Sequence, residues 1–442
     1  MPSSLRRSTA RPLALTNSVL NLVKSEVQRL PLRSSKSSSS IPKSHASVST
    51  ARSGKDSIPS MPSRRVARSR GRPHPIHTLP SEILAQIFLV AAQRDAMAPM
   101  AISHVCSTWR SIALHTPSLW RRLSLDNRVD MWKERVRRAR ACTLDVELFY
   151  SPSPNGAHMP QTHPVDFCNI QWYMHVVTPF IHRWRSLQIS FPNYAPFMWN
   201  AALSSCCGRG GRIAAPAIEE LSLTYPANDD TKEYTLFDGF APRLRNVTVD
   251  GIRLTWLPSL FQNVTVLRYT HHAFTRGHQA ISEVLTILQV SSRVEHLELS
   301  FPERRRPSLP QSFGEPTFNI VSLPYLRHFH ISIVTSDIPS EMLTLIAHMH
   351  FPSLHSLFLS DDRTFIPKQA FPRTEAFFRC LRKPLSLVSI RAELGWLGGN
   401  LLLRWMADIP SLRECIVTDS TGRACSLLQS ERKRSRRRRT VE

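Results

Sequence analysis

Apolar residues at the start of the chain's patterned region follow a helical period. Ile83, Leu84, Ile87 and Phe88 fall on one face of a helix, and Pro80 predicts that this helix begins nearby, because proline is well tolerated in a first turn. Two further helical segments are marked by Val105, Trp109, Ile112 and Ala113 and by Thr116-Pro117 ahead of Leu119 and Trp120. We expect three short helices in residues 76–125. A module of this size cannot enclose all of these side chains, so another part of the chain or another protein must cover some of them.

A second pattern, a degenerate form of L-x-x-L-x-L, predicts strands over the rest of the region. From Trp184 onward it recurs every 20 to 34 residues. Its instances begin at Trp120, Ala141, Trp184, Ile218, Leu244, Val264, Val294, Leu326, Leu354, Leu387 and Leu412. The alternation places two side chains inward on a short strand, and helix candidates lie between the strands at residues 280–290, 340–350, 375–381 and 401–407. The pattern predicts βα units with a parallel sheet on one face; scattered strands in a mixed α/β domain are the alternative.

The helical segment carries a family resemblance. Leu79-Pro80-x-Glu82-Ile83-Leu84-x-x-Ile87-Phe88, Val105-Cys106-x-x-Trp109-Arg110-x-Ile112-Ala113 and Thr116-Pro117-x-Leu119-Trp120 closely resemble the F-box motif. The resemblance implies a three-helix module that docks on the Skp adaptor of a cullin–RING ubiquitin ligase. It implies that the following residues lie at that contact or directly support it: Leu79, Pro80, Ile83, Leu84, Ile87, Phe88, Val105, Cys106 and Trp109. The segment Gln93–Pro99 departs from the tightest members of the family by being longer and more polar.

The strand pattern resembles an irregular leucine-rich repeat. The segment that follows Trp120 continues the F-box into this pattern. Taken together, most of residues 76–420 resemble the F-box proteins with degenerate leucine-rich repeats of mushroom-forming fungi. The expected fold class is α/β, with a short three-helix F-box at 76–125 and a leucine-rich-repeat-like βα solenoid at 126–428. A target protein would bind the strand face, for which the candidate residues are Glu219, Glu220, Arg245, Arg268, Glu295, His296, Arg327, His328 and Arg413.

Charge is concentrated in the two ends of the chain. Residues 1–75 hold 15 Lys/Arg against two acids, and residues 430–442 hold seven against two, so most of the net charge of +24 lies there. Thirteen serines in residues 31–63 predict a disordered arm, and the first ~25 residues resemble a mitochondrial presequence only in composition. The expected domains outside the body are therefore a disordered basic arm at 1–75 and a basic tail at 429–442.

The C-terminal basic run predicts a nuclear-localisation signal. Its residues are Arg432, Lys433, Arg434, Arg436, Arg437, Arg438 and Arg439. We expect the protein in the nucleus, the cytoplasm or both. An alternative function is nucleic-acid binding through the two arms. Such binding would fall steeply with salt and would be lost without the arms, whereas adaptor binding by residues 76–125 would survive.

No sequence motif points to an enzyme or a cofactor. The chain has no G-x-G-x-x-G after a strand, no Walker loop, no H-E-x-x-H and no G-x-S-x-G. Its eight cysteines form no C-x-x-C pair, which excludes a zinc ribbon or RING, and no apolar run reaches 18 residues, which argues against a membrane-spanning helix. His271, His272 and His278 form a cluster for which metal binding is conceivable, but partly exposed polar residues are the favoured interpretation. We expect no enzyme activity, no cofactor, no metal and no membrane partner.

Overall fold

The computed structural model describes residues 75–125, 129–149, 166–207, 213–302, 318–363, 369–397, 401–418 and 424–426. The predicted N-terminal arm, up to residue 74, and the basic tail with its nuclear-localisation signal lie outside the described residues. Backbone contacts divide the chain into two compact units, Met1–Leu119 and Trp120–Glu442. Each unit is considered by itself below.

Two of the three expected helices of the first unit are the α-helices α2 (Ser81–Arg94) and α4 (Ser107–His115), and the third, predicted from Thr116-Pro117, is the 3-10 helix η2 (Pro117–Trp120). Helix α3 (Ala98–Ser103) was not predicted, and the 3-10 helix η1 (Pro75–Thr78) precedes α2. Pro80 is the N-cap of α2, and Glu82 adds a carboxylate to its first turn, where the helix dipole favours negative charge. In the segment Gln93–Pro99, which departs from the tighter family pattern, α2 includes the first two residues and α3 the last two, and residues 95–97 form the turn between these helices.

The second unit is built on one twelve-stranded sheet whose strands follow chain order. The strands are β1 (Arg122–Ser124), β2 (Leu144–Phe149), β3 (Trp184–Ser190), β4 (Glu220–Thr224), β6 (Asn246–Asp250), β8 (Val266–Thr270), β9 (His296–Phe301), β11 (His328–Ile333), β13 (Ser356–Asp361), β14 (Ser389–Glu393), β15 (Glu414–Thr418) and β16 (Ala424–Ser426). All neighbours pair in parallel except β15 and β16, which are antiparallel. Each of the eleven sequence instances forms one of these strands, which confirms a parallel sheet of many strands.

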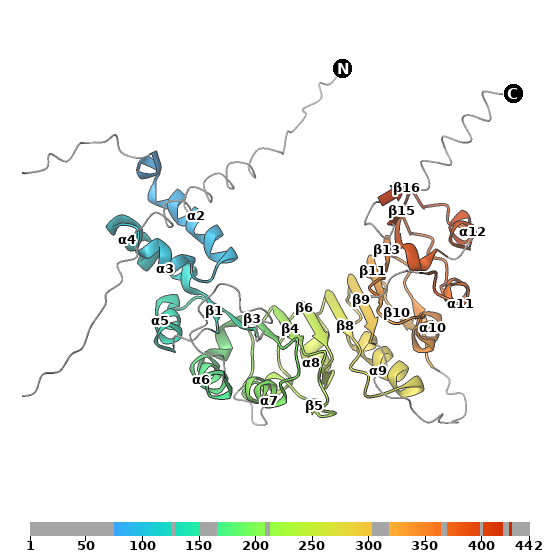
Figure 1. The fold of residues 1–442 in the computed structure, drawn as a ribbon, viewed down its shortest axis with the longest axis horizontal. Helices are drawn as coiled ribbons and strands as arrows, with labels where there is room; N and C mark the ends of the chain where they lie inside the picture. The colour runs from blue at the N-terminus through green and yellow to red at the C-terminus, as the bar shows by residue number, and fades with distance from the viewer. Residues whose placement is uncertain are drawn as a thin grey trace, which may run out of the picture. The chain divides into compact units, whose positions relative to one another are not determined.

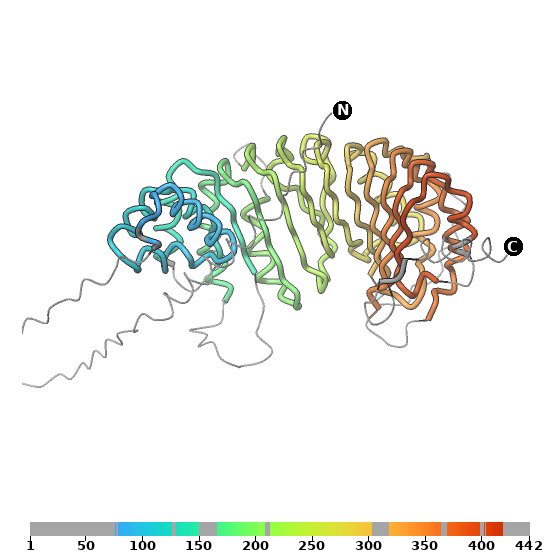
Figure 2. Tube along the Cα trace, turned by 90° about the horizontal axis from the view of Figure 1, so that it is seen from above, coloured from blue at the N-terminus to red at the C-terminus, as the bar shows by residue number. Residues whose placement is uncertain are grey.

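Helices connect the strands because parallel neighbours require crossover connections. They are α5 (Val129–Ala139), α6 (Phe167–Val177), α7 (Pro196–Ser204), α8 (Pro258–Phe261), α9 (Gly277–Val290), α10 (Ser340–Ala347), α11 (Thr374–Cys380) and α12 (Leu401–Ala407), with the 3-10 helices η3 (Thr178–Arg183), η4 (Phe237–Gly239) and η5 (Leu394–Trp396). Figure 1 shows these helices along one side of the sheet. In Figure 2 the strands of this unit lie side by side in chain order.

The core of the second unit lies between the sheet and its helices. Leu221, Val247, Leu267 and Leu297 are successive partners in the strand register and are buried. Because strand residues alternate between faces, the intervening residues line the opposite face of the sheet, and most of them are half-buried or exposed. The alternation predicted from sequence therefore separates a core face from an accessible face.

One predicted helix differs from the structure at its end. The helix expected at 340–350 ends at Ala347, and Met349 and His350 form strand β12, which pairs with β10 (Val321–Ser322). Leu323 N donates a hydrogen bond to His350 O at 2.8 Å. The pairing with β10 therefore supplies His350 with a backbone hydrogen bond outside the helix. A third sheet joins β5 (Glu233–Tyr234) to β7 (Arg253–Leu254). Helix α5 ends at Ala139, because Arg140 adopts φ 49° in the left-handed region.

Candidate functional site

The nine residues of the predicted adaptor contact fall into two groups in the first unit. Leu84, Phe88 and Trp109 are buried, and the rings of Phe88 and Trp109 lie 4.8 Å apart between centroids. The remaining six are exposed or half-buried: Leu79, Pro80, Ile83, Ile87, Val105 and Cys106. The buried group supports the module from inside, and the six accessible residues, called here the apolar row, are free to meet a partner. Among them, the Ile83 side chain is 48% exposed.

Cys106 has a structural role that the sequence did not reveal. It is the N-cap of α4, and its Sγ accepts a hydrogen bond from Trp109 N at 3.4 Å. Serine, threonine and asparagine usually occupy this position because an oxygen acceptor caps the free N–H groups of the first turn. A thiol at this position therefore fixes the start of α4 and the backbone of Trp109.

The nine candidate target-binding residues all lie on or beside the accessible face of the sheet. Glu220, His296 and His328 are the first residues of their strands, and Arg268 is the third residue of β8. The other five immediately precede strands: Glu219, Arg245, Glu295, Arg327 and Arg413. Their backbones form a ladder across the sheet; Arg327 N, for example, donates to Glu295 O at 2.9 Å.

A charged cluster joins three strands on this face. Arg268 Nε lies 3.4 Å from Glu298 Oε2, and His330 Nδ1 lies 3.5 Å from Glu298 Oε1. His330 also stacks on Phe358, with 4.4 Å between ring centroids. The hydrogen bond from His330 lowers the pKa of Glu298, despite partial burial. Glu298 and His330 were absent from the predicted set, although their strand positions match that of Arg268.

Sequence analysis also missed ion pairs at the start of the sheet. Arg185 donates to both carboxylate oxygens of Asp145, at 2.9 and 2.8 Å. Arg122 Nε lies 2.7 Å from Glu147 Oε1. These acids occupy strand β2, and both are buried. The ion pairs tie neighbouring strands together, and their acids are already satisfied within the fold.

His271 and His272 are buried, which corrects the interpretation of the histidine cluster as partly exposed. His272 Nε2 lies 3.1 Å from Glu283 Oε2, Thr275 Oγ1 donates to the same oxygen at 2.6 Å, and Arg253 Nη2 donates to Glu283 Oε1 at 3.0 Å. Burial opposes ionisation of Glu283, but hydrogen bonds from both histidines and Thr275 outweigh it, so its pKa lies well below the usual range. We call this group the Glu283 network.

The Glu283 network has ligand types suited to a metal, but its hydrogen bonds oppose one. His271 Nδ1 and His272 Nδ1 accept backbone N–H groups from Ala273 and Phe274, each at 3.1 Å. An imidazole that accepts at Nδ1 carries its proton on Nε2 when neutral. The Nε2 atoms that would bind a metal are therefore protonated and face Glu283, whereas a metal-bound histidine usually donates from its other nitrogen. The geometry fits a structural network.

This network predicts that acid destabilises the second unit. Burial is the main cause that lowers the pKa of His271 below its ordinary value of 6.5, so the unfolded chain takes up a proton there before the folded protein does. The free energy of unfolding should therefore fall as the pH drops below about 6.5. Thermal unfolding at pH 7.5 and 5.5 measures the loss. His271→Asn keeps an acceptor for Ala273 N–H and should reduce this pH dependence; an unchanged dependence would contradict the assignment.

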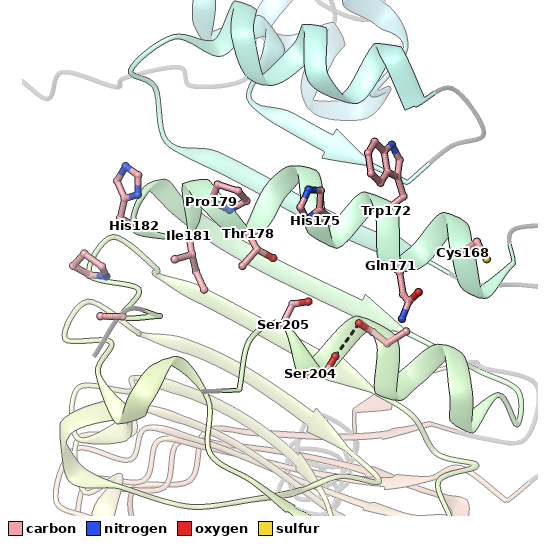
Figure 3. A pocket seen from close by; sticks show the side chains of 13 residues that line it. Cys168, Gln171, Trp172, His175, Thr178, Pro179, Ile181, His182, Ser204 and Ser205 are labelled. Carbon is pink, nitrogen blue, oxygen red and sulfur yellow. Dashed lines mark hydrogen bonds between the residues drawn. The ribbon is translucent and has the colours of Figure 1, made fainter. Parts of the chain in front are cut away.

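A hollow of about 1020 Å³ lies between α6–η3 and α7 in the second unit. Figure 3 shows Cys168 and His175 along one side of it and Ser204 and Ser205 on the other. No carboxylate is among its described lining residues, and Cys168 and His175 lie seven residues apart on one helix, or about 10 Å along its axis. Among its described lining residues, no hydrogen bond joins His175 or His182 to Cys168, Ser204 or Ser205, so no nucleophile is paired with a base there.

Comparison with known proteins bears on the first unit. Residues 76–126 match the family model of the F-box-like domain. No curated protein matches the chain. Within the described residues, no helix has the length and apolar character needed to cross a membrane. The match supports an F-box protein, and F-box domains generally bind the Skp adaptor within cullin-based ubiquitin ligases.

Proposed function

We propose that this protein is a substrate-recognition subunit of a Skp–cullin–F-box ubiquitin ligase. Its F-box-like domain would dock on the Skp adaptor, and its sheet, as an irregular leucine-rich-repeat solenoid, would hold a target protein. The observation that carries the proposal is the family match over residues 76–126. The apolar row supports it, because a small helical module that leaves apolar side chains accessible suits a partner-binding role.

The second unit suits the other half of this function. Its accessible face presents charged and imidazole side chains from many strands in register. Repeat arrays use such extended surfaces for binding. No covalent chemistry on this chain is needed, because holding the target beside the conjugating enzyme raises its effective concentration to about the millimolar range.

The apolar row provides the direct test. Ile83→Asp places a charge at an accessible position of α2 and should weaken capture of the Skp adaptor at least about 30-fold, equivalent to about 2 kcal/mol. The module should stay folded, because Ile83 is 48% exposed. A pull-down with purified Skp adaptor, combined with circular dichroism, measures both properties.

Ser111→Asp is the matched control. Ser111 is an exposed residue of α4 outside the apolar row, so the same charge there should leave capture within about twofold of the wild-type protein. Equal capture by the wild-type and Ile83→Asp proteins would contradict the proposed docking surface. Absence of capture by the folded wild-type chain would contradict the function.

A further inference from the structure

Three histidines and an arginine gather where the central strands of the sheet begin. His296 and His328 are the first residues of β9 and β11 and lie directly opposite each other in the register. Their rings stack with centroids 4.3 Å apart and an interplanar angle of 10°. Arg327 and His355 precede β11 and β13, and His355 N donates to Arg327 O at 2.9 Å. All four side chains are exposed, and we call them the histidine band.

The histidine band is short of negative charge. Three basic residues act on His328: His296 on β9, Arg327 directly before β11, and His355 directly before β13. Glu295 is the acid that acts on it. Burial, followed by His296 and the other cations, lowers the pKa of His328. Within the described ranges, Arg327 forms no ion pair.

Glu298, a carboxylate farther along the face, is already engaged. Glu298 pairs with Arg268 from β8 and with His330 from β11. His330 Nε2 in turn lies 2.8 Å from Ser360 Oγ of β13. The Glu298 carboxylate is therefore engaged by Arg268 and His330, and a partner could supply the negative charge that the histidine band lacks.

The size of a shallow hollow beside the histidine band limits the size of the ligand group that can bind there. It has a volume of about 160 Å³ and is lined by His296, His328, His330 and Phe358, among others. That volume accommodates a side chain but is below the range of ~300–1,000 Å³ for small-molecule pockets. The surroundings therefore suit a peptide that runs across the strands and places short acidic side chains at the imidazoles.

We propose that the histidine band binds an aspartate- or glutamate-rich segment of a protein partner across strands β9, β11 and β13. This proposal rests on the proposed function, in which the sheet holds the target. Carboxylates would accept charge-assisted hydrogen bonds from Arg327 and from protonated imidazoles. A negatively charged ligand would interact favourably with the stacked histidines and with their basic neighbours. Charge complementarity therefore favours this class of partner.

Binding of this kind is coupled to proton uptake. An anionic ligand favours the charged form of nearby histidines, so the affinity should rise as the pH falls from 7.5 to 6.0, where aspartate stays ionised. The arginine-rich ends of the chain also attract anions, but arginine does not titrate in this range. The N-terminal arm also holds His45 and His74, so the distinguishing result is the loss of the pH-dependent component when His296 and His328 are replaced.

The experiment uses the full chain and a rhodamine-labelled deca-aspartate peptide, with fluorescence anisotropy at pH 7.5 and 6.0 and constant ionic strength. We expect the wild-type protein to bind at least about threefold more tightly at pH 6.0. The double variant His296→Asn/His328→Asn should lose this pH dependence. The control His175→Asn/His182→Asn removes the same number of exposed histidines at a different place in the unit and should retain it.

The outcomes separate this proposal from the proposed function. Equal affinity at the two pH values, or an unchanged pH dependence in His296→Asn/His328→Asn, would overturn the histidine band as an acidic-peptide site. The same pH-dependent gain for a ten-nucleotide single-stranded DNA, lost in the same variant, would overturn a protein segment as its partner. Capture of the Skp adaptor is measured on the same samples. If the protein captures the adaptor but fails the peptide test, only the acidic-peptide site is contradicted. If the folded wild-type protein does not capture the adaptor, the proposed ligase function is contradicted.

Discussion

Trp109→Ala is expected to unfold the three-helix unit and abolish capture of the Skp adaptor. Trp109 is 2% exposed and packs its ring against Phe88, which is fully buried. Truncation of a buried tryptophan typically costs about 3–5 kcal/mol. A module of three short helices has little stability in reserve, so a loss of this size should remove most of its folded population.

Limited proteolysis within residues 76–119, run beside an adaptor pull-down, measures this effect. Thr108→Ala, at an exposed neighbouring position of α4, serves as the control and should behave as the wild-type protein does. Trp109→Ala differs from Ile83→Asp, which should lose capture while remaining protease-resistant. If Trp109→Ala resisted protease and captured adaptor normally, the assignment of Trp109 to the core of this unit would be wrong.

The sequence could identify the helical module but could not sort its apolar residues. Ile83 and Leu84 are neighbours in the same motif, yet Ile83 is 48% exposed and Leu84 is 3% exposed. Successive helix residues differ by about 100° in direction, and the boundary between core and surface depends on how α3 and α4 pack against α2. A motif weights both positions alike, so only the three-dimensional packing separates a supporting residue from an accessible one.

The strands were predictable because a single template carried both the alternation and the spacing. The same template could have located the stacked imidazoles, since His296 and His328 occupy the same template position in consecutive instances. Equivalent positions on adjacent parallel strands lie about 4.8 Å apart. The signal for the histidine band was therefore present in the sequence, whereas two-residue strands such as β12 are too short to show an alternation.

The Glu283 network had no comparable signal. Its loop turns through Ala273, which adopts φ 63° in the left-handed region, and alanine rarely adopts this conformation. That turn lets His271 and His272 both approach a carboxylate that lies on α9. Burial of these histidines follows from the loop's path, which residue types and periodicity do not encode.

Leu297→Ala and Leu357→Ala are expected to loosen the central sheet while sparing adaptor capture. Both side chains are buried, at 2% and 0% exposed, and both pair in register with Phe329, one from each side. Truncation of a buried leucine typically costs about 2–5 kcal/mol. In a repeat-like array each strand contacts mainly its neighbours, so the damage should stay near β9, β11 and β13 and leave the three-helix unit able to bind.

Hydrogen exchange of peptides from both units, beside the adaptor pull-down, tests this separation. Leu385→Ala is the control, because that side chain is 74% exposed and its loss should change stability by no more than about 0.5 kcal/mol. The two truncations lie two strands apart, so their costs should nearly add unless Phe329 shifts into the space that they leave. If either truncation abolished adaptor capture as fully as Trp109→Ala, the two units would not act independently, and an adaptor with separate docking and target-holding ends would be refuted.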